Sequence, residues 1–290
     1  MQDKRERLTI DFVGRKAEMA VRHWPVEPSR GLVLCLHGVG STGAEFAFLA
    51  SRLNERGYDV VCPDWLGHGD SDYLMDANAY RWEVYVRSVV VLINRYNASR
   101  VHLLGVSWGG MMLLLYLVGS RFLATSATFV DVPLRANPAL LQSTKGMRIL
   151  SAAAFDTRDE MEALLMSRRP DLRTTPDEWR EYLREARFAR RNGKYVMKYD
   201  QAAISMLETY GSAPFDNFRA LDRFKFECLF IYGRFSPFRD PERFRPYLAQ
   251  YPNIHYSDLL DAAHPPSLFE AHQTAPIEAF LEKVTAANET

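Results

Sequence analysis

The sequence predicts an α/β protein whose mostly parallel, eight-stranded β-sheet is flanked by helices and interrupted by an inserted helical cap. Short aliphatic runs alternate with longer amphipathic runs through the first 133 residues. This alternation stops from residue 134 to residue 222 and resumes at residue 223. Strands that alternate with helices pair in parallel through right-handed crossovers. We therefore expect one core, residues 1–133 and 223–290, with residues 134–222 forming the cap.

The core segments can be assigned in chain order. Residues 8–13 and 17–24 alternate in polarity around Gly14, which predicts an antiparallel hairpin at a sheet edge. Continuous apolar runs are typical of strands that are buried on both faces. Six such runs follow: residues 31–37, 58–64, 101–107, 126–133, 226–233 and 253–260. Helical patterns cover residues 45–57, 80–96, 111–119 and 276–284.

The cap segment is rich in arginine and interrupted by prolines. Thr175, Pro176 and Glu178 predict a helix start, because threonine can cap a helix and proline suits its first turn. Four arginines then recur at helical spacing: Arg180, Arg184, Arg187 and Arg191. They form either a solvated face with intrahelical ion pairs or a stripe that steers an anionic substrate. Three later residues belong either to a pocket wall or to the core: Met197, Tyr199 and Met206.

Composition narrows the range of partners. Lys plus Arg and Asp plus Glu number 36 each, so no overall field attracts nucleic acid or an anionic membrane, and we expect a small-molecule substrate. The charged N-terminal stretch lacks an apolar run of signal-peptide length, which indicates a soluble, cytoplasmic protein. Cys35, Cys62 and Cys228 lie in apolar runs and are expected to be reduced core thiols. No residue spacing matches a metal or phosphate site, so we expect no cofactor, and a homodimer is left open.

The stretch Gly105-Val106-Ser107-Trp108-Gly109 lies between a predicted buried strand and a predicted apolar helix. A polar residue at the end of a buried strand must either form a hydrogen bond or have a chemical function. Gly-x-Ser-x-Gly between a strand and a helix indicates a nucleophile, because small neighbours permit a strained turn from which the hydroxyl projects. The alternative is a serine that only caps the following helix.

Four stretches together resemble the α/β-hydrolase superfamily: LCLHGVGSTG (34–43), PDWLGHGDSD (63–72), GVSWGG (105–110) and DAAHPP (261–266). This resemblance implies that Ser107 is the nucleophile and that His264 is the general base. A serine hydroxyl needs such an imidazole, since it is a poor nucleophile until its proton is accepted. The other strand or helix histidines are expected to have structural roles: His23, His102, His255 and His272.

The resemblance also implies an oxyanion hole made of two backbone N–H groups. Trp108 follows the nucleophile and supplies one of them, and we assign Val39 as the other. Ser41 either lines the pocket or pairs with its own backbone. Three neighbours are expected to hold their turns rather than to transfer protons: His37, His68 and Asp64.

The triad acid departs from the superfamily pattern. The usual position, three residues after the glycine that ends the seventh strand, is occupied by Ser236, which cannot carry the charge. Asp131 ends the sixth strand, where some branches of the superfamily place their acid, and we assign it. Asp240 is the alternative, although Asp240 before Pro241 also fits a helix N-cap. Asp258, Asp261 and the absence of any carboxylate are left open.

These residues predict a cofactor-independent serine hydrolase that cleaves a small carboxylic ester through an acyl-enzyme. A cap over the site would exclude longer acyl chains and water. The same catalytic residues can also cleave lactones and the C–C bonds of meta-cleavage products, which are the alternative substrates. Receptors that bind a ligand use the fold too, and the fold alone does not separate these functions.

Overall fold

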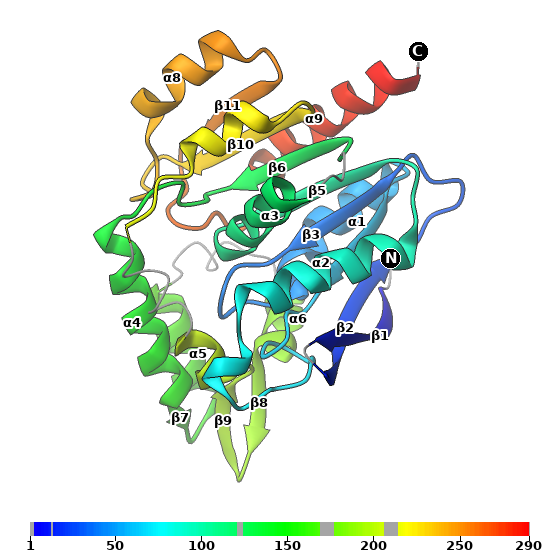
Figure 1. Cartoon of the computed structure of the whole chain (residues 1–290). Helices are drawn as coiled ribbons and strands as arrows, with labels where there is room; N and C mark the ends of the chain where they lie inside the picture. The colour runs from blue at the N-terminus through cyan, green and yellow to red at the C-terminus, as the bar shows by residue number, and fades with distance from the viewer. Residues whose placement is uncertain (1–2, 13, 121–123, 169–176, 206–213, 290) are drawn as a thin grey trace.

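A mostly parallel sheet of eight strands forms the centre of the molecule (Figure 1), as predicted. The computed structural model describes residues 3–12, 14–120, 124–168, 177–205 and 214–289. The strand order is β1-β2-β4-β3-β5-β6-β10-β11. β2 pairs antiparallel with β1 and with β4, and the other neighbours pair in parallel. The strands are β1 (Lys4–Phe12), β2 (Arg15–Trp24), β3 (Leu32–Leu36), β4 (Asp59–Pro63), β5 (Val101–Val106), β6 (Ser126–Val130), β10 (Glu227–Gly233) and β11 (Ile254–Leu259).

Helices cover both faces of this sheet and enclose two apolar layers. One layer contains residues of α1 (Ala47–Glu55) and α9 (Ala271–Glu289). The other contains residues of α2 (Trp82–Tyr96), α3 (Trp108–Gly119) and α8 (Pro241–Gln250). In β3, Leu34 faces one layer while Val33 and Cys35 face the other, because successive side chains of a strand point to opposite faces. Burial on both faces explains why the central strands are apolar throughout.

The chain between β6 and β10 forms a separate group of elements at one end of the sheet, at the lower left of Figure 1. Its elements are α4 (Pro138–Ala152), β7 (Ala154–Phe155), α5 (Arg158–Arg168), α6 (Asp177–Arg187), β8 (Phe188–Arg191) and β9 (Lys194–Met197). We keep the name cap for this group. The 3-10 helix η4 (Phe218–Arg223) then leads back to β10.

The sequence predicted a helical cap, whereas the structure adds a three-stranded antiparallel sheet in the order β7-β9-β8. Asn192 and Gly193 have φ angles of 50° and 77° and connect β8 to β9, with Arg191 paired to Lys194. Two positive φ angles are what a two-residue hairpin turn requires, and Asn-Gly is its typical sequence. This signal was missed. The arginine stripe is corrected as well, because α6 ends at Arg187 and Arg191 belongs to β8.

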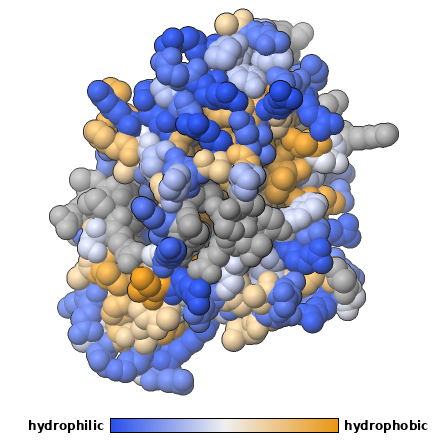
Figure 2. All heavy atoms as spheres, turned by 60° about the vertical axis from the view of Figure 1, so that its left-hand side comes forward, coloured by the Kyte–Doolittle hydropathy of each residue, from blue (hydrophilic) through white to orange (hydrophobic). Residues whose placement is uncertain are grey.

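Several smaller predictions can also be compared with the structure. Cys35, Cys62 and Cys228 are buried free thiols, as predicted. α6 begins at Asp177, while Thr175 and Pro176 of the predicted helix start lie outside the described residues. In the described parts of the chain, none of the helices has the length and hydropathy needed to cross a bilayer. On the face shown in Figure 2, hydrophobic side chains form separate groups among hydrophilic ones.

Candidate active site

Ser107 occupies a strained turn between β5 and α3. Its φ and ψ angles are 49° and −116°, a conformation that residues other than glycine rarely adopt. The flanking glycines are required by close packing. A Cβ atom on Gly105 would lie 2.5 Å from Gly110 Cα, and one on Gly109 would lie 2.1 Å from the carbonyl oxygen of Leu36. The glycines therefore allow the strand, the turn and the helix to approach one another closely enough to form this turn.

Ser107, His264 and Asp131 lie in a line, although they come from three separate loops. Ser107 Oγ is 3.1 Å from His264 Nε2, and His264 Nδ1 is 3.2 Å from Asp131 Oδ2. The second contact is at ion-pair distance, but the ring N–H is not directed closely enough at the oxygen to form a hydrogen bond. Catalytic contacts are often this loose before substrate binds. The sequence-predicted nucleophile, base and acid are thus brought together.

Asp131 has the imidazole of His264 as its neighbour. Its side chain is completely buried, and neither carboxylate oxygen accepts a hydrogen bond from the described residues. The residue follows β6 with a φ angle of 55°, and its N–H donates to the carbonyl oxygen of Ile231. A buried carboxylate is costly unless it is paired. The imidazole of His264, at 3.2 Å, is therefore its natural partner.

The alternative acids are engaged elsewhere. Asp240 caps α8 by accepting a hydrogen bond from the N–H of Arg243, and it forms a 2.9 Å ion pair with Arg135. Asp258 forms a bidentate ion pair with Arg239, at 2.8 and 2.6 Å. Ser236 accepts a hydrogen bond from the N–H of Phe238. The ring of Phe238 stands edge-on to His264, so an apolar group occupies this side of the imidazole.

The loop after β3 lies directly against the nucleophile. A Cβ atom on Gly38 would be 3.5 Å from Ser107 Cβ, and Val39 and Trp108 border the same cavity as Ser107. Trp108 is the first residue of α3, where a helix leaves its N–H groups without intrahelical partners. The two residues assigned to the oxyanion hole therefore lie beside the serine, and their N–H roles stay a prediction.

His37 holds this loop and is uncharged. Its Nδ1 donates to the carbonyl oxygen of Gly38 at 2.7 Å, and its Nε2 accepts from the N–H of Trp65 at 2.9 Å. Burial lowers the pKa of His37 to about 4 and that of His68 to about 3. Asp64 accepts from the N–H groups of Gly43 and Asp70, which ties two turns together. These contacts agree with the structural roles expected for the three residues.

Comparison with known proteins agrees with this geometry. A family model described as the alpha/beta hydrolase fold matches residues 31–271. The chain belongs to this family. It is similar to a 3-hydroxybutyrate-oligomer hydrolase of Cupriavidus necator (32% identity over 164 residues, 56% of this chain and 55% of that protein). It also resembles a proline iminopeptidase of Lactobacillus delbrueckii subsp. lactis (33% over 113 residues, 36% of this chain and 38% of that protein). The chain thus spans about half or less of the length of these curated relatives.

Among solved structures, an alpha/beta hydrolase from Novosphingobium aromaticivorans superposes with a TM-score of 0.81 at 23% identity, over 97% of this chain and 99% of that one. At this identity the likeness concerns the fold alone. Together with the family match, it shows that the chain has the α/β-hydrolase fold.

Ser107 borders a cavity of about 410 Å³ that is lined by residues of the core and of the cap. The core contributes the loops around Ser107 and His264, and the cap contributes apolar side chains of α4, α5 and β9. Met197 and Tyr199, two of the candidate wall residues, line the cavity, as does Ser41; Met206 lies outside the described residues. A cavity of this size suits a small organic molecule.

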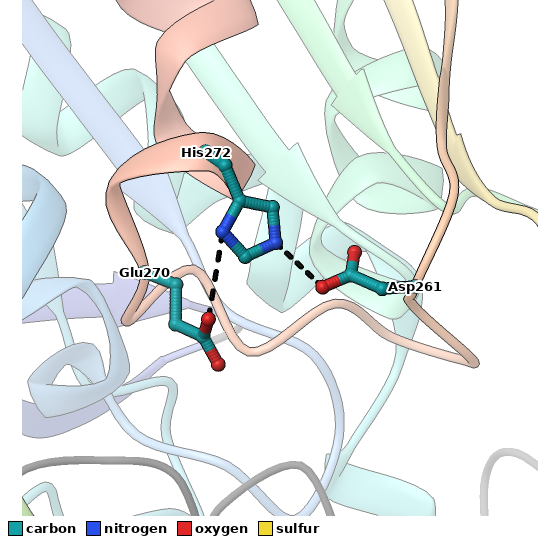
Figure 3. A group of neighbouring side chains, drawn as sticks. All are labelled: Asp261, Glu270 and His272. Carbon is teal, nitrogen blue, oxygen red and sulfur yellow. Dashed lines mark hydrogen bonds and ion pairs between the residues drawn. The ribbon is translucent and has the colours of Figure 1, made fainter.

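The remaining histidines have partners away from this cavity. His23 contacts Glu6 and Asp59, His102 contacts Ser126, and His255 contacts Glu227. The contacts of His272 were not indicated by residue spacing. Figure 3 shows Asp261 at its Nε2, at 2.5 Å, and Glu270 at its Nδ1, at 3.4 Å. One potential ligand atom of each of the three residues lies within 4.8 Å of the other two, and the two carboxylates face different nitrogens of the ring.

Proposed function

We propose that this hydrolase cleaves a small carboxylic ester through an acyl-enzyme. The observation that carries the proposal is the line of contacts from Ser107 through His264 to Asp131, at 3.1 and 3.2 Å, beside a cavity that residues of the core and of the cap line. A serine hydroxyl in contact with an imidazole, which is itself paired to a buried carboxylate, is the arrangement that activates serine as a nucleophile.

The reaction would proceed in two halves. Ser107 Oγ attacks the ester carbonyl carbon while its proton passes to His264 Nε2, and the carbonyl oxygen becomes an oxyanion facing the N–H groups of Val39 and Trp108. Each such donor contributes roughly 3 kcal/mol of transition-state stabilisation. The intermediate collapses and expels the alcohol, which takes the proton from His264. Water then attacks the acyl-enzyme by the same steps and releases the carboxylic acid. Asp131 holds the imidazole with its proton on Nδ1, so that Nε2 can accept the proton of the nucleophile, and it stabilises the imidazolium that then forms.

The identity of the nucleophile can be tested by covalent labelling. An organophosphonate probe is expected to label Ser107, and Ser107→Ala should lose both labelling and ester turnover. The matched control is Ser151→Ala, which removes an exposed hydroxyl on α4 and should change neither. If the wild-type protein binds a ligand in calorimetry but is neither labelled nor active, a binding protein replaces the enzyme as the better proposal.

Substrate size gives a second measurement with the same protein. Short-chain p-nitrophenyl esters are expected to react faster than long-chain ones, because the cavity holds about 410 Å³ and the cap covers it. A preference for acyl chains of about 12 carbons or more would contradict this reasoning. Lactones and meta-cleavage products belong in the same panel, as do amides, since one curated relative is named an iminopeptidase. Faster turnover of any of these would replace the ester as the substrate class.

A further inference from the structure

Arg187 is a charged side chain in a mostly apolar cavity. It ends α6 and lines the cavity that also contains Ser107 and His264. Its side chain is only 5% exposed. Apart from the histidines and a tyrosine, Arg187 and Glu45 are the two residues with ionisable side chains among the described lining residues. Several of the remaining lining residues are methionines: Met111, Met147, Met161 and Met197.

The hydrogen-bonding capacity of this guanidinium is incompletely used. Nη2 pairs with Glu45, while Nε is buried and has no partner among the described residues. Arg184, less than one helical turn earlier, also has a buried Nε without a partner among the described residues, but both of its Nη atoms pair with carboxylates, those of Glu162 and Glu181. A guanidinium carries five N–H donors, and burying them without partners is unfavourable. Arg187 is therefore suited to bind a further anion.

We propose that Arg187 binds a carboxylate of the substrate. The preferred substrates would then be esters that also carry a free carboxylate, such as half-esters of dicarboxylic acids or acylated hydroxy acids. This inference rests on the proposed esterase function and adds a substrate class to it. Arginine matches the planar geometry of a carboxylate, and such charge-assisted bonds are strong where water is excluded. Binding at Arg187 would hold one end of the molecule while the ester group lies at Ser107.

The test compares matched substrates that differ in one charge. Monophenyl adipate carries a carboxylate, and methyl phenyl adipate is its neutral counterpart; 3-acetoxybutyrate and its methyl ester place the charge on the alcohol side. The wild-type enzyme is expected to have a higher kcat/KM for the anionic member of at least one pair. Arg187→Gln should lower that kcat/KM by about 10- to 100-fold, mainly through KM, and leave the neutral ester within about threefold.

Two further variants separate substrate binding from a structural role. Glu45→Gln breaks the ion pair between cap and core but keeps the positive charge, so the preference for the anionic ester should persist or increase. Arg191→Gln removes an exposed arginine outside the cavity and should leave the preference unchanged. Equal losses in Arg187→Gln and Glu45→Gln on both members of a pair would overturn the proposal, because they would show that the ion pair only joins cap and core.

A binding measurement distinguishes failure of this inference from failure of the esterase proposal. In Ser107→Ala, calorimetry is expected to show tighter binding of monophenyl adipate or 3-acetoxybutyrate than of the methyl ester, and loss of that difference when Arg187→Gln is added. Neutral esters that are turned over without any such difference would overturn the inference alone. A clear difference in binding without turnover by the wild-type enzyme would overturn the esterase function and keep the anion site.

Discussion

Replacing Asp131 by Asn tests the triad acid most directly. At 3.2 Å, a carboxylate and an imidazolium attract each other by about 5 kcal/mol at an effective dielectric constant of about 20. The reaction creates this imidazolium on His264, so its transition state loses most of that energy in Asp131→Asn. Since about 1.4 kcal/mol corresponds to tenfold in rate, we expect kcat to fall by roughly 10³- to 10⁴-fold.

The fold should tolerate this change. Asn adopts the left-handed conformation of Asp131, whose φ angle is 55°, more easily than other non-glycine residues do. It also removes a buried charge and keeps the shape of the side chain. The melting temperature should therefore stay within about 2 °C of wild type, which corresponds to about 1 kcal/mol for a chain of 290 residues. A loss of activity without unfolding would then report on catalysis.

Asp240→Asn is the matched control. Asn caps helices as well as Asp does, and the lost ion pair involves Arg135, which is 59% exposed and contributes at most about 1 kcal/mol. We expect near-normal kcat on a short-chain p-nitrophenyl ester, with each variant checked by thermal melting. The assignment is wrong if Asp131→Asn retains near-normal turnover, and Asp240 is the acid if only its variant loses activity.

Two further predictions concern stability. Acid should destabilise the fold. Burial lowers the pKa of His37 to about 4 and that of His68 to about 3. Below about pH 6.5 the unfolded chain therefore takes up protons on these rings that the folded chain does not. Each of the two histidines should lower the free energy of unfolding by about 2 kcal/mol between pH 7.5 and pH 5, as measured by urea titration. A smaller decrease in His37→Gln than in wild type would support this. A free energy of unfolding that does not change with pH in wild type would contradict it. Gly109→Ala should cost about 3 kcal/mol or more, because its Cβ would lie 2.1 Å from the carbonyl oxygen of Leu36. Gly119→Ala, whose Cβ would meet nothing within 4 Å, should be neutral or slightly stabilising in the same titration, and equal effects of the two changes would refute the packing argument.

The parts of the fold that depend on local signals were predictable from the sequence. Continuous apolar runs marked the central strands because both faces of those strands are buried. The strand, the small residues and the helix around Ser107 indicate a strained turn from the sequence alone. The Asn192-Gly193 turn was an equally local signal, but it was missed beside the surrounding helical pattern. Its short strands, of four residues each, show no alternation long enough to stand out.

The choice between Asp131 and Asp240 depends on strand order, which the sequence does not state. β5, which ends at the nucleophile, lies beside β6, and β10 and β11 follow. Because parallel strands end at one edge of the sheet, the residue after β6 lies between Ser107 and the loop that carries His264. Asp240 lies farther along the chain after β10 and is used as a helix cap. The usual position of the acid, after the seventh strand, is occupied by Ser236. Strand adjacency explains how a residue after the sixth strand, Asp131, can take its place beside His264.

The arginines of the cap show why a regular pattern does not determine function. Helical spacing placed Arg184 and Arg187 on similar faces of one helix, and the sequence allowed either ion pairs or contact with substrate. In the structure both arginines form ion pairs, but with partners in different parts of the fold. Arg184 is paired to glutamates of the cap, whereas Arg187 ends the helix at the cavity, where Glu45 of the core is its partner. The distinction arises from where α6 ends and what it faces, which are properties of the tertiary structure. A charge in such a cavity affects substrate choice only because the apolar residues around it exclude the water that would otherwise screen it.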